Sequence, residues 1–233
     1  MCFSYYGGKS KIIKYYPKPK FDTIIEPFCG SGCYSYTYGL NKNVWLNDKY
    51  EIIYKIWKYL INTTEERINQ LPNIKKGDDI RNFNLTQDEI YLMGFCCANG
   101  RANPGFTVTA FGDKTHYPKN DVRWRPHSTW QLSKARILKV LPYIKNWKIT
   151  NEDYLNLPDI EATWYIDPPY MFGGNRYIEN KIDYKQLSEW CLSRKGQVIV
   201  CENNKCNNWL PFKPLCTLHG SKHKTEEVIW TND

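Results

Sequence analysis

Residues 22–32, with the sequence DTIIEPFCGSG, indicate how the chain folds. A short apolar run ends at Glu26, and a turn of small residues follows, which is typical of a buried strand that leads into a helix. Apolar runs end in the same way at Asp48 and at Asp167. Because ligands bind beyond the carboxyl ends of parallel strands, we expect these three acids at one functional edge of a sheet.

Apolar runs and segments with helical spacing alternate along most of the chain. Helices are expected at residues 33–40, 51–61, 86–98, 128–145 and 184–194, and strands at residues 22–27, 43–48, 147–151, 163–167, 197–201, 214–219 and 227–231. Thr86 and Glu89 form an expected capping box at the start of one helix. Strands that alternate with helices predict an α/β fold, with a mostly parallel sheet covered on both faces.

Residues 99–126 show no helical period. Such a long irregular stretch in a compact domain is usually functional or disordered. Only two acids occur in it, whereas its lysines and arginines are Arg101, Lys114, Lys119, Arg123 and Arg125. Arg101 is expected to bind a guanine edge or a phosphate, or to remain a solvated surface residue. The other four are expected to contact a nucleic-acid backbone.

The composition favours a globular protein with a polyanionic partner. The 233 residues carry a net charge of +8, and nucleic acid is the commonest partner of a basic domain. No apolar run approaches the roughly 20 residues that span a bilayer, and the N-terminus lacks the apolar core of a signal peptide. The nine cysteines are scattered and odd in number, so we expect reduced thiols in an intracellular protein.

Gly30 and Gly32 follow the first strand and allow the backbone to approach a ligand closely. The spacing does not match the GxGxxG pattern that cradles a pyrophosphate. Asp48 ends the next strand, where a carboxylate can accept hydrogen bonds from both hydroxyls of a ribose. A ligand with a ribose but no pyrophosphate suggests S-adenosylmethionine, and an ordinary tight turn remains the alternative.

The sequence DPPY at residues 167–170 predicts a rigid corner of hydrogen-bond acceptors. Prolines fix φ near −65° and have no N–H donor, so carbonyl oxygens there remain available. The Asp167 carboxylate and the Pro168 carbonyl can accept both N–H groups of a base's exocyclic amine and aim its lone pair at a methyl donor. Tyr170 can stack on the base. The same acceptor pair fits N6 of adenine and N4 of cytosine.

These motifs resemble, almost from end to end, those of the Dam-type DNA adenine-N6 methyltransferases. YYGGK at residues 5–9 is similar to an N-terminal element that helps to hold the cofactor, and ITNEDY at residues 149–154 resembles an element that contacts its adenine. RANPGFTVTAFG at residues 101–112 resembles the recognition segment. Positions that depart from the family pattern are Phe106, Thr107, Ala110 and Glu152.

The resemblance implies roles for individual residues. The implied cofactor site consists of Tyr6, Gly8, Lys9, Glu26, Pro27, Phe28, Gly30, Gly32, Asp48, Asp153 and Asp167. The implied catalytic residues are Asp167, Pro168 and Tyr170. The implied DNA-binding residues are Arg101, Asn103, Lys114, Lys119, Arg123 and Arg125.

We therefore predict a Rossmann-like seven-stranded methyltransferase sheet with its last strand antiparallel. An S-adenosylmethionine-binding catalytic domain is expected at residues 1–61 and 129–233, with an inserted DNA target-recognition region at residues 62–128. The predicted reaction transfers a methyl group to N6 of a flipped adenine in double-stranded DNA. N4-cytosine methylation and a non-catalytic DNA-binding protein on a methylase fold are the alternatives.

No metal and no membrane partner are expected. A zinc-finger spacing does occur at Cys201, Cys206, His219 and His223. Pro211 and Pro214 would interrupt the helix that such a finger requires. We expect the protein in the cytoplasm or nucleoid, and a phage or viral origin is compatible with the sequence. A restriction endonuclease would be a separate protein and is not required.

Overall fold

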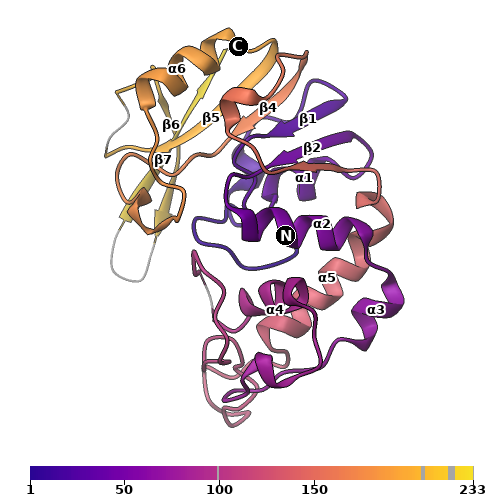
Figure 1. Ribbon diagram of the computed structural model, residues 1–233. Helices are drawn as coiled ribbons and strands as arrows, with labels where there is room; N and C mark the ends of the chain where they lie inside the picture. Colours follow the sequence, from indigo (N-terminus) through magenta and orange to yellow (C-terminus); the bar gives the residue numbers. More distant parts are fainter. Residues whose placement is uncertain (99, 206–207, 220–223, 233) are drawn as a thin grey trace. The chain divides into compact units, whose positions relative to one another are not determined.

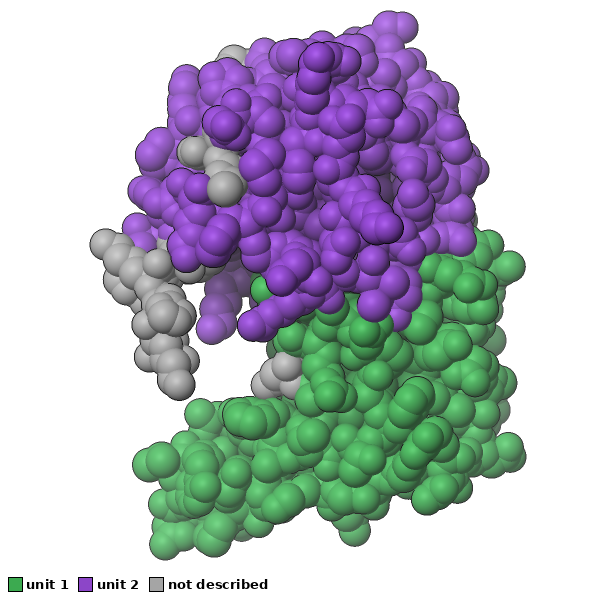
Figure 2. Space-filling view, turned by 60° about the vertical axis from the view of Figure 1, so that its left-hand side comes forward, with its two compact units in different colours: residues 1–8, 51–146 green, residues 9–50, 147–233 purple. Residues whose placement is uncertain are grey.

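A computed structural model describes residues 1–98, 100–205, 208–219 and 224–232 (Figure 1). Contacts within the chain divide it into two compact units (Figure 2). The first unit comprises Met1–Gly8 and Glu51–Asn146, and the second comprises Lys9–Tyr50 and Trp147–Asp233. No helix within the described ranges is both long and apolar enough to cross a membrane.

The second unit holds a seven-stranded sheet in the order β3-β2-β1-β4-β5-β7-β6. Its strands are β1 (Thr23–Glu26), β2 (Asn43–Asn47), β3 (Lys148–Thr150), β4 (Ala162–Ile166), β5 (Gly196–Asn203), β6 (Lys213–His219) and β7 (Lys224–Thr231). Strands β1 to β5 are parallel, whereas β7 runs antiparallel to both β5 and β6. The α/β class and the antiparallel last strand are confirmed, and the order of β3 to β5 is that of a Rossmann-like sheet.

Alternate side chains of the central strands pack on opposite faces of this sheet. The flanking helices of the unit are α1 (Cys33–Tyr38) and α6 (Tyr184–Ser193). Trp164 of β4 packs edge-on against Trp190 of α6, with ring centroids 5.4 Å apart. The next residue, Tyr165, stacks on Tyr34 of α1 at 4.3 Å. Helices thus cover both faces, which is why the strands read as nearly continuous apolar runs.

Three short 3-10 helices complete the second unit. They are η1 (Ile13–Tyr15), η3 (Tyr154–Asn156) and η4 (Gly174–Arg176). η1 precedes β1, whereas η3 and η4 lie in connections between longer elements, and the sequence pattern predicts no regular structure at any of the three.

The first unit is helical. Its elements are α2 (Glu51–Asn62), α3 (Glu65–Gln70), η2 (Ile80–Asn82), α4 (Gln87–Gly94) and α5 (Thr129–Ile144). Helix α2 contacts α4 and α5, and α3 also contacts α5. The predicted capping box of Thr86 and Glu89 is confirmed at the start of α4. Helix α3 is not evident from the sequence pattern, because six residues are too few to show a helical period.

The irregular stretch is anchored to the helical unit by backbone hydrogen bonds. The described residues 100–126 contribute to none of the named helices or strands. The N–H of Gly105 donates to the carbonyl of Gly94 (3.0 Å), and the N–H of Thr109 donates to the carbonyl of Cys97 (2.8 Å). The sequence allows this stretch to be either disordered or an ordered functional segment. These hydrogen bonds favour an ordered segment.

The compact helical unit is wider than the predicted insertion. It extends from residue 51 to residue 146 and includes the N-terminal eight residues, whereas the recognition region is predicted at residues 62–128. Helices α2 and α5 belong to it because they pack on each other and on α3 and α4. The assignment of residues 62–128 to DNA recognition stays a prediction.

Replacing Gly112 by alanine should destabilise the protein. A Cβ at Gly112 would lie 2.2 Å from the carbonyl oxygen of Cys97, so the backbone would have to shift. We expect the free energy of unfolding in urea to fall by about 1–3 kcal/mol. The matched control is Gly105→Ala, whose Cβ would meet chiefly the flexible end of the Arg101 side chain. Equal losses in the two variants would contradict a tightly packed Gly112.

Candidate active site

Four acids lie at the carboxyl ends of adjacent parallel strands in the second unit. Glu26 is the last residue of β1, Asp48 follows β2, Asp167 follows β4, and Glu202 lies near the end of β5. The strand order β2-β1-β4-β5 places them along one edge of the sheet. The sequence analysis predicts three of them at this edge. Glu202 also follows an apolar run, so the same signal was available for it.

Asp167 is held by a buried lysine. The ammonium of Lys9 lies 2.9 Å from Oδ1 of Asp167, and their side chains are 7% and 21% exposed. Burial by itself would lower the pKa of Lys9, but the charges of Asp167 and Glu227 raise it well above its ordinary value. Lys9 is therefore a charged partner of the predicted catalytic acid. Its predicted contact with the cofactor stays a prediction.

Glu227 joins the same cluster from β7, where it pairs with Asn203 of β5. Its Oε1 accepts hydrogen bonds from the hydroxyl of Tyr16 (2.6 Å) and from that of Tyr170. The same oxygen lies 3.8 Å from the Lys9 ammonium. This ammonium also lies 4.7 Å from the centroid of the Tyr170 ring, within cation–π range. The cluster thus fixes Tyr170 by both its hydroxyl and its ring.

The DPPY corner is fixed by its surroundings. The carbonyl of Pro169 accepts a hydrogen bond from the Tyr184 hydroxyl (2.7 Å), and both prolines of the motif are buried. The N–H of Met171 donates to Glu202 (3.1 Å), which ties the following loop to β5. Within the described residues, no hydrogen bond occupies the carbonyl oxygen of Pro168. That oxygen is therefore available to a ligand beside Asp167.

The glycine loop after β1 is shaped by Asp48. Gly30 and Gly32 have φ values of 46° and 59°, a left-handed region that favours glycine. Asp48 accepts hydrogen bonds from the N–H of Gly30 (2.8 Å) and from that of Tyr50 (3.0 Å). Burial raises the pKa of Asp48 to about 6, although these two bonds oppose the shift. Asp48 is only half-buried, and its carboxylate keeps lone pairs for a polar ligand.

Glu26 points back into the fold. Its Oε1 accepts a hydrogen bond from the N–H of Ser35 in α1 (2.7 Å), and the residue is fully buried. Burial raises the pKa of Glu26 to about 8. The contact ties the end of β1 to the first turn of α1 and so fixes the ends of the glycine loop.

A buried asparagine links the neighbouring strand ends. The side-chain amide of Asn47 donates to the carbonyls of Pro27 and Glu152, both at 3.0 Å. Asp153, the predicted adenine contact, caps η3 through the N–H of Leu155 and pairs with Lys49 at 3.0 Å. The ring of Phe28 lies 5.3 Å from that of Tyr154, so the predicted residues Pro27, Phe28, Asp48 and Asp153 border one region. The sequence analysis does not single out Asn47.

The remaining predicted cofactor residues, Tyr6 and Gly8, belong to the first unit. The N–H of Tyr6 donates to the carbonyl of Arg101 (3.0 Å), and the N–H of Gly8 donates to the carbonyl of Tyr5 (3.2 Å). The N-terminal element is thus bonded to the start of the predicted recognition segment. Its role toward a cofactor stays a prediction.

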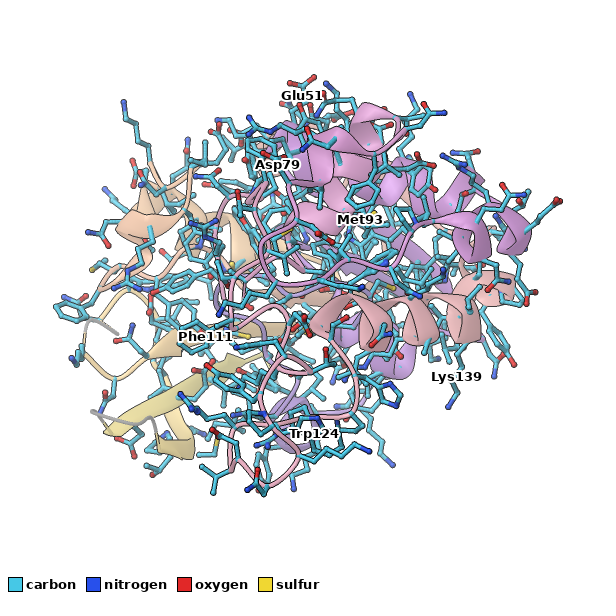
Figure 3. All side chains as sticks on the ribbon, turned by 90° about the horizontal axis from the view of Figure 1, so that it is seen from below. Glu51, Asp79, Met93, Phe111, Trp124 and Lys139 are labelled. Atoms are coloured by element: carbon cyan, nitrogen blue, oxygen red, sulfur yellow. The ribbon has the colours of Figure 1, made fainter. Side chains whose placement is uncertain are left out.

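The predicted DNA-binding residues lie in the irregular segment of the first unit, and most are exposed. Exposed members are Arg101, Asn103, Lys119, Arg123 and Arg125. Arg123 forms a two-point ion pair with Asp121 and lies 4.0 Å from the Tyr117 ring. Phe111, which is 66% exposed, and Trp124 lie on the same segment (Figure 3).

Two of these cations line a pocket of about 300 Å³ within the first unit. Lys114 and Arg125 contribute to it from the irregular segment, His127 from the residues before α5, and Arg136 from α5 itself. Arg136 was not among the predicted DNA-binding residues, because it lies on a predicted helix outside the basic segment. Four basic side chains around one hollow suit an anionic group.

The chain was compared with known proteins. A family model described as D12 class N6 adenine-specific DNA methyltransferase matches residues 5–207. The chain belongs to this family. No curated protein matches it.

Solved structures resemble this methyltransferase only distantly. Two structures of the rRNA methyltransferase aviRa from Streptomyces viridochromogenes are 14% identical to it, with TM-scores of 0.41 and 0.40. They cover 95% and 91% of this chain and are themselves covered to 80% and 79%. A conserved hypothetical protein of Streptococcus pyogenes is 8% identical, with a TM-score of 0.39 and coverage of 94% of this chain and 89% of its own.

No metal-binding group of three or more His, Cys, Asp or Glu residues occurs in the described part of the methyltransferase. The cysteines in those ranges are free thiols, and Cys201 is buried in β5. Two residues of the zinc-finger spacing, Cys206 and His223, lie outside the described residues.

The buried acids should make the stability of the methyltransferase depend on pH. Burial raises the pKa of Glu26 to about 8 from an ordinary value of 4.5, so between these pH values the folded state binds more protons than the unfolded state. The free energy of unfolding should therefore fall as the pH rises through this window. Glu26→Gln keeps an acceptor for Ser35 without titrating, and its stability should vary less with pH.

Urea unfolding at several pH values measures this dependence. Glu161→Gln, which removes an exposed carboxylate, is the control and should follow the wild-type profile. A wild-type slope retained in Glu26→Gln would show that Glu26 does not carry the effect.

Proposed function

We propose that this methyltransferase transfers the methyl group of S-adenosylmethionine to N6 of an adenine flipped out of duplex DNA. The observation that carries the proposal is the acceptor pair at the DPPY corner. The Asp167 carboxylate is partly exposed, and the Pro168 carbonyl beside it has no partner among the described residues. Together they would accept the two N–H groups of an adenine amine.

The residues at the sheet edge fit S-adenosylmethionine. Gly30 and Gly32 have no side chains that would keep a ligand away from the turn, and Asp48 would offer a carboxylate to ribose hydroxyls. Phe28 and Asp153 would contact the adenine ring of the cofactor. The bound cofactor would supply an electrophilic methyl carbon on a sulfonium sulfur. Lys9 and Glu26, which are also predicted at the cofactor site, would hold that site through their partners Asp167 and Ser35.

The chain's own groups would orient the target amine. An exocyclic amine is a weak nucleophile because its lone pair is delocalised into the ring. Hydrogen bonds to Asp167 and Pro168 would favour the pyramidal nitrogen, whose lone pair then points away from the ring. Tyr170, fixed by Glu227, would pack against the base. A base in this position has left the helical stack, at a cost of about a few kcal/mol.

The helical unit would supply the DNA contacts. Its exposed basic segment and the pocket lined by Lys114 and Arg136 suit the phosphates of a duplex. Arg101 would read a base edge or bind a phosphate. Because chromosomal or viral DNA is the substrate, the proposed place of action is the cytoplasm or nucleoid. A restriction endonuclease partner would be a separate chain.

Asp167→Ala should abolish methylation while cofactor binding persists. The variant removes one acceptor, and Lys9 retains Glu227 as a charged partner. We expect kcat to fall roughly a hundredfold or more, and the dissociation constant for S-adenosylmethionine, measured by calorimetry, to change little. Near wild-type turnover in this variant would rule out Asp167 as the catalytic acceptor.

Mass analysis of nucleosides identifies the product. DNA treated with the wild-type enzyme should contain N6-methyladenine and no N4-methylcytosine. N4-methylcytosine without N6-methyladenine would show that the acceptor corner binds the amine of cytosine instead. DNA binding without any methylated nucleoside would favour a non-catalytic DNA-binding protein.

Removing pocket cations should weaken the salt dependence of DNA binding. Each lost phosphate contact reduces the slope of log K against log salt by about one. We expect this change for Lys114→Ala and for Arg136→Ala, measured by fluorescence anisotropy with a labelled duplex. Lys139→Ala, an exposed lysine on α5 (Figure 3), loses the same charge and should leave the slope unchanged. Equal slopes in all three variants would exclude the pocket as a phosphate site.

A further inference from the structure

The cluster around Asp167 contains more negative than positive charge. The ammonium of Lys9 lies between two carboxylates, 2.9 Å from Oδ1 of Asp167 and 3.8 Å from Oε1 of Glu227. The side chains of Lys9 and Glu227 are 7% and 3% exposed. In the described part of the chain, Lys9 is the one cation paired with these two carboxylates, so the three groups together carry one negative charge in excess. Burial keeps a nearby acid, Glu26, largely protonated, because it raises the pKa of Glu26 to about 8.

An excess negative charge at this buried position lowers the stability of the folded state. A buried carboxylate without a full counter-charge destabilises the folded state. The protein offsets part of this cost with the hydroxyls of Tyr16 and Tyr170, which both donate to Oε1 of Glu227. A fold that needed only to hold Lys9 could do so with Asp167 alone. The second carboxylate therefore suggests a role in the reaction.

We propose that Glu227 is a positioning residue that keeps the acceptor corner one negative charge in excess, to stabilise the cation formed when the target amine is methylated. The inference rests on the proposed function. The lone pair of the amine nitrogen forms a bond to the methyl carbon. The carbon–sulfur bond breaks, and its electron pair stays on the sulfur. The nitrogen carries a positive charge until one of its protons is lost to water. Without Glu227, the charges of Lys9 and Asp167 would balance. The positive charge on the methylated nitrogen would then form beside a group with no net charge.

Glu227 also gives Lys9 a second partner. When Asp167 accepts an N–H of the incoming base, the ammonium can remain paired through Glu227, because both carboxylates already lie within its reach. Asp167 then binds the amine without stranding a buried cation.

Glu227→Gln removes the charge and keeps the shape and an acceptor for the two tyrosines. We expect kcat to fall roughly tenfold to a hundredfold, with little change in the affinity for S-adenosylhomocysteine. The matched control is Glu226→Gln, the same substitution one residue earlier, where the side chain accepts a hydrogen bond from Asn204. This control should retain wild-type turnover.

A binding measurement tests the charge without turnover. Sinefungin carries a protonated amine where S-adenosylmethionine carries its methylsulfonium, whereas S-adenosylhomocysteine is neutral there. The ratio of the two affinities, measured by calorimetry, should fall about tenfold in Glu227→Gln and should not change in Glu226→Gln. A ratio and a kcat that both match wild type in Glu227→Gln would overturn the inference.

A double variant separates charge from structure. Lys9→Met combined with Glu227→Gln leaves Asp167 as the single charge and restores the original excess. This double variant should recover part of the sinefungin preference lost in Glu227→Gln. No recovery would mean that Glu227 acts by shape alone and would overturn the charge assignment. A wild-type enzyme that shows the preference but methylates no DNA would refute the proposed function and with it the role of Glu227 in methyl transfer, and only the excess negative charge of the cluster would remain supported.

Discussion

A lysine ammonium buried between two carboxylates organises the candidate active site. Such an ammonium is tolerated only when its charge is met, and here Asp167 and Glu227 meet it. The two acids come from strands far apart in the sequence, since one follows β4 and the other lies on β7. Only β5 separates these strands in the sheet. The antiparallel insertion of β7 beside β5 is therefore what brings Glu227 to the predicted catalytic acid.

Local chemistry then makes the corner stiff enough to position an amine. Two prolines limit the backbone after β4, and Tyr184 and Glu202 bond the peptide groups that follow. The neighbouring glycine loop is fixed by hydrogen bonds to two acids. Asp48 accepts a hydrogen bond from the loop backbone, and Glu26 accepts one from the backbone of α1. A rigid acceptor corner near a glycine turn fits the proposed methyl transfer, since reactivity depends on alignment.

The sequence predicted the features that depend on short-range patterns. Apolar runs that end in acids located three strands and the edge where Glu26, Asp48 and Asp167 lie, and the capping box located the start of α4. Features that depend on distant partners were not predictable. Tyr16 and Glu227 are 211 residues apart and meet only through the strand order. The same holds for Asn47, whose amide bridges segments 20 and 105 residues away. The irregular segment showed its charge in the sequence but not its anchoring to Gly94 and Cys97, which depends on close packing of glycines.

The central claim is that Asp167 accepts the amine of an extruded adenine. A crystal structure of the enzyme with S-adenosylhomocysteine and a duplex that contains its target site tests this claim most directly. The account predicts the adenine N6 within hydrogen-bond distance of both the Asp167 carboxylate and the Pro168 carbonyl, with Lys9 still paired to Glu227. A target base outside the stack but bound elsewhere, or an Asp167 carboxylate turned away from the homocysteine sulfur, would contradict it.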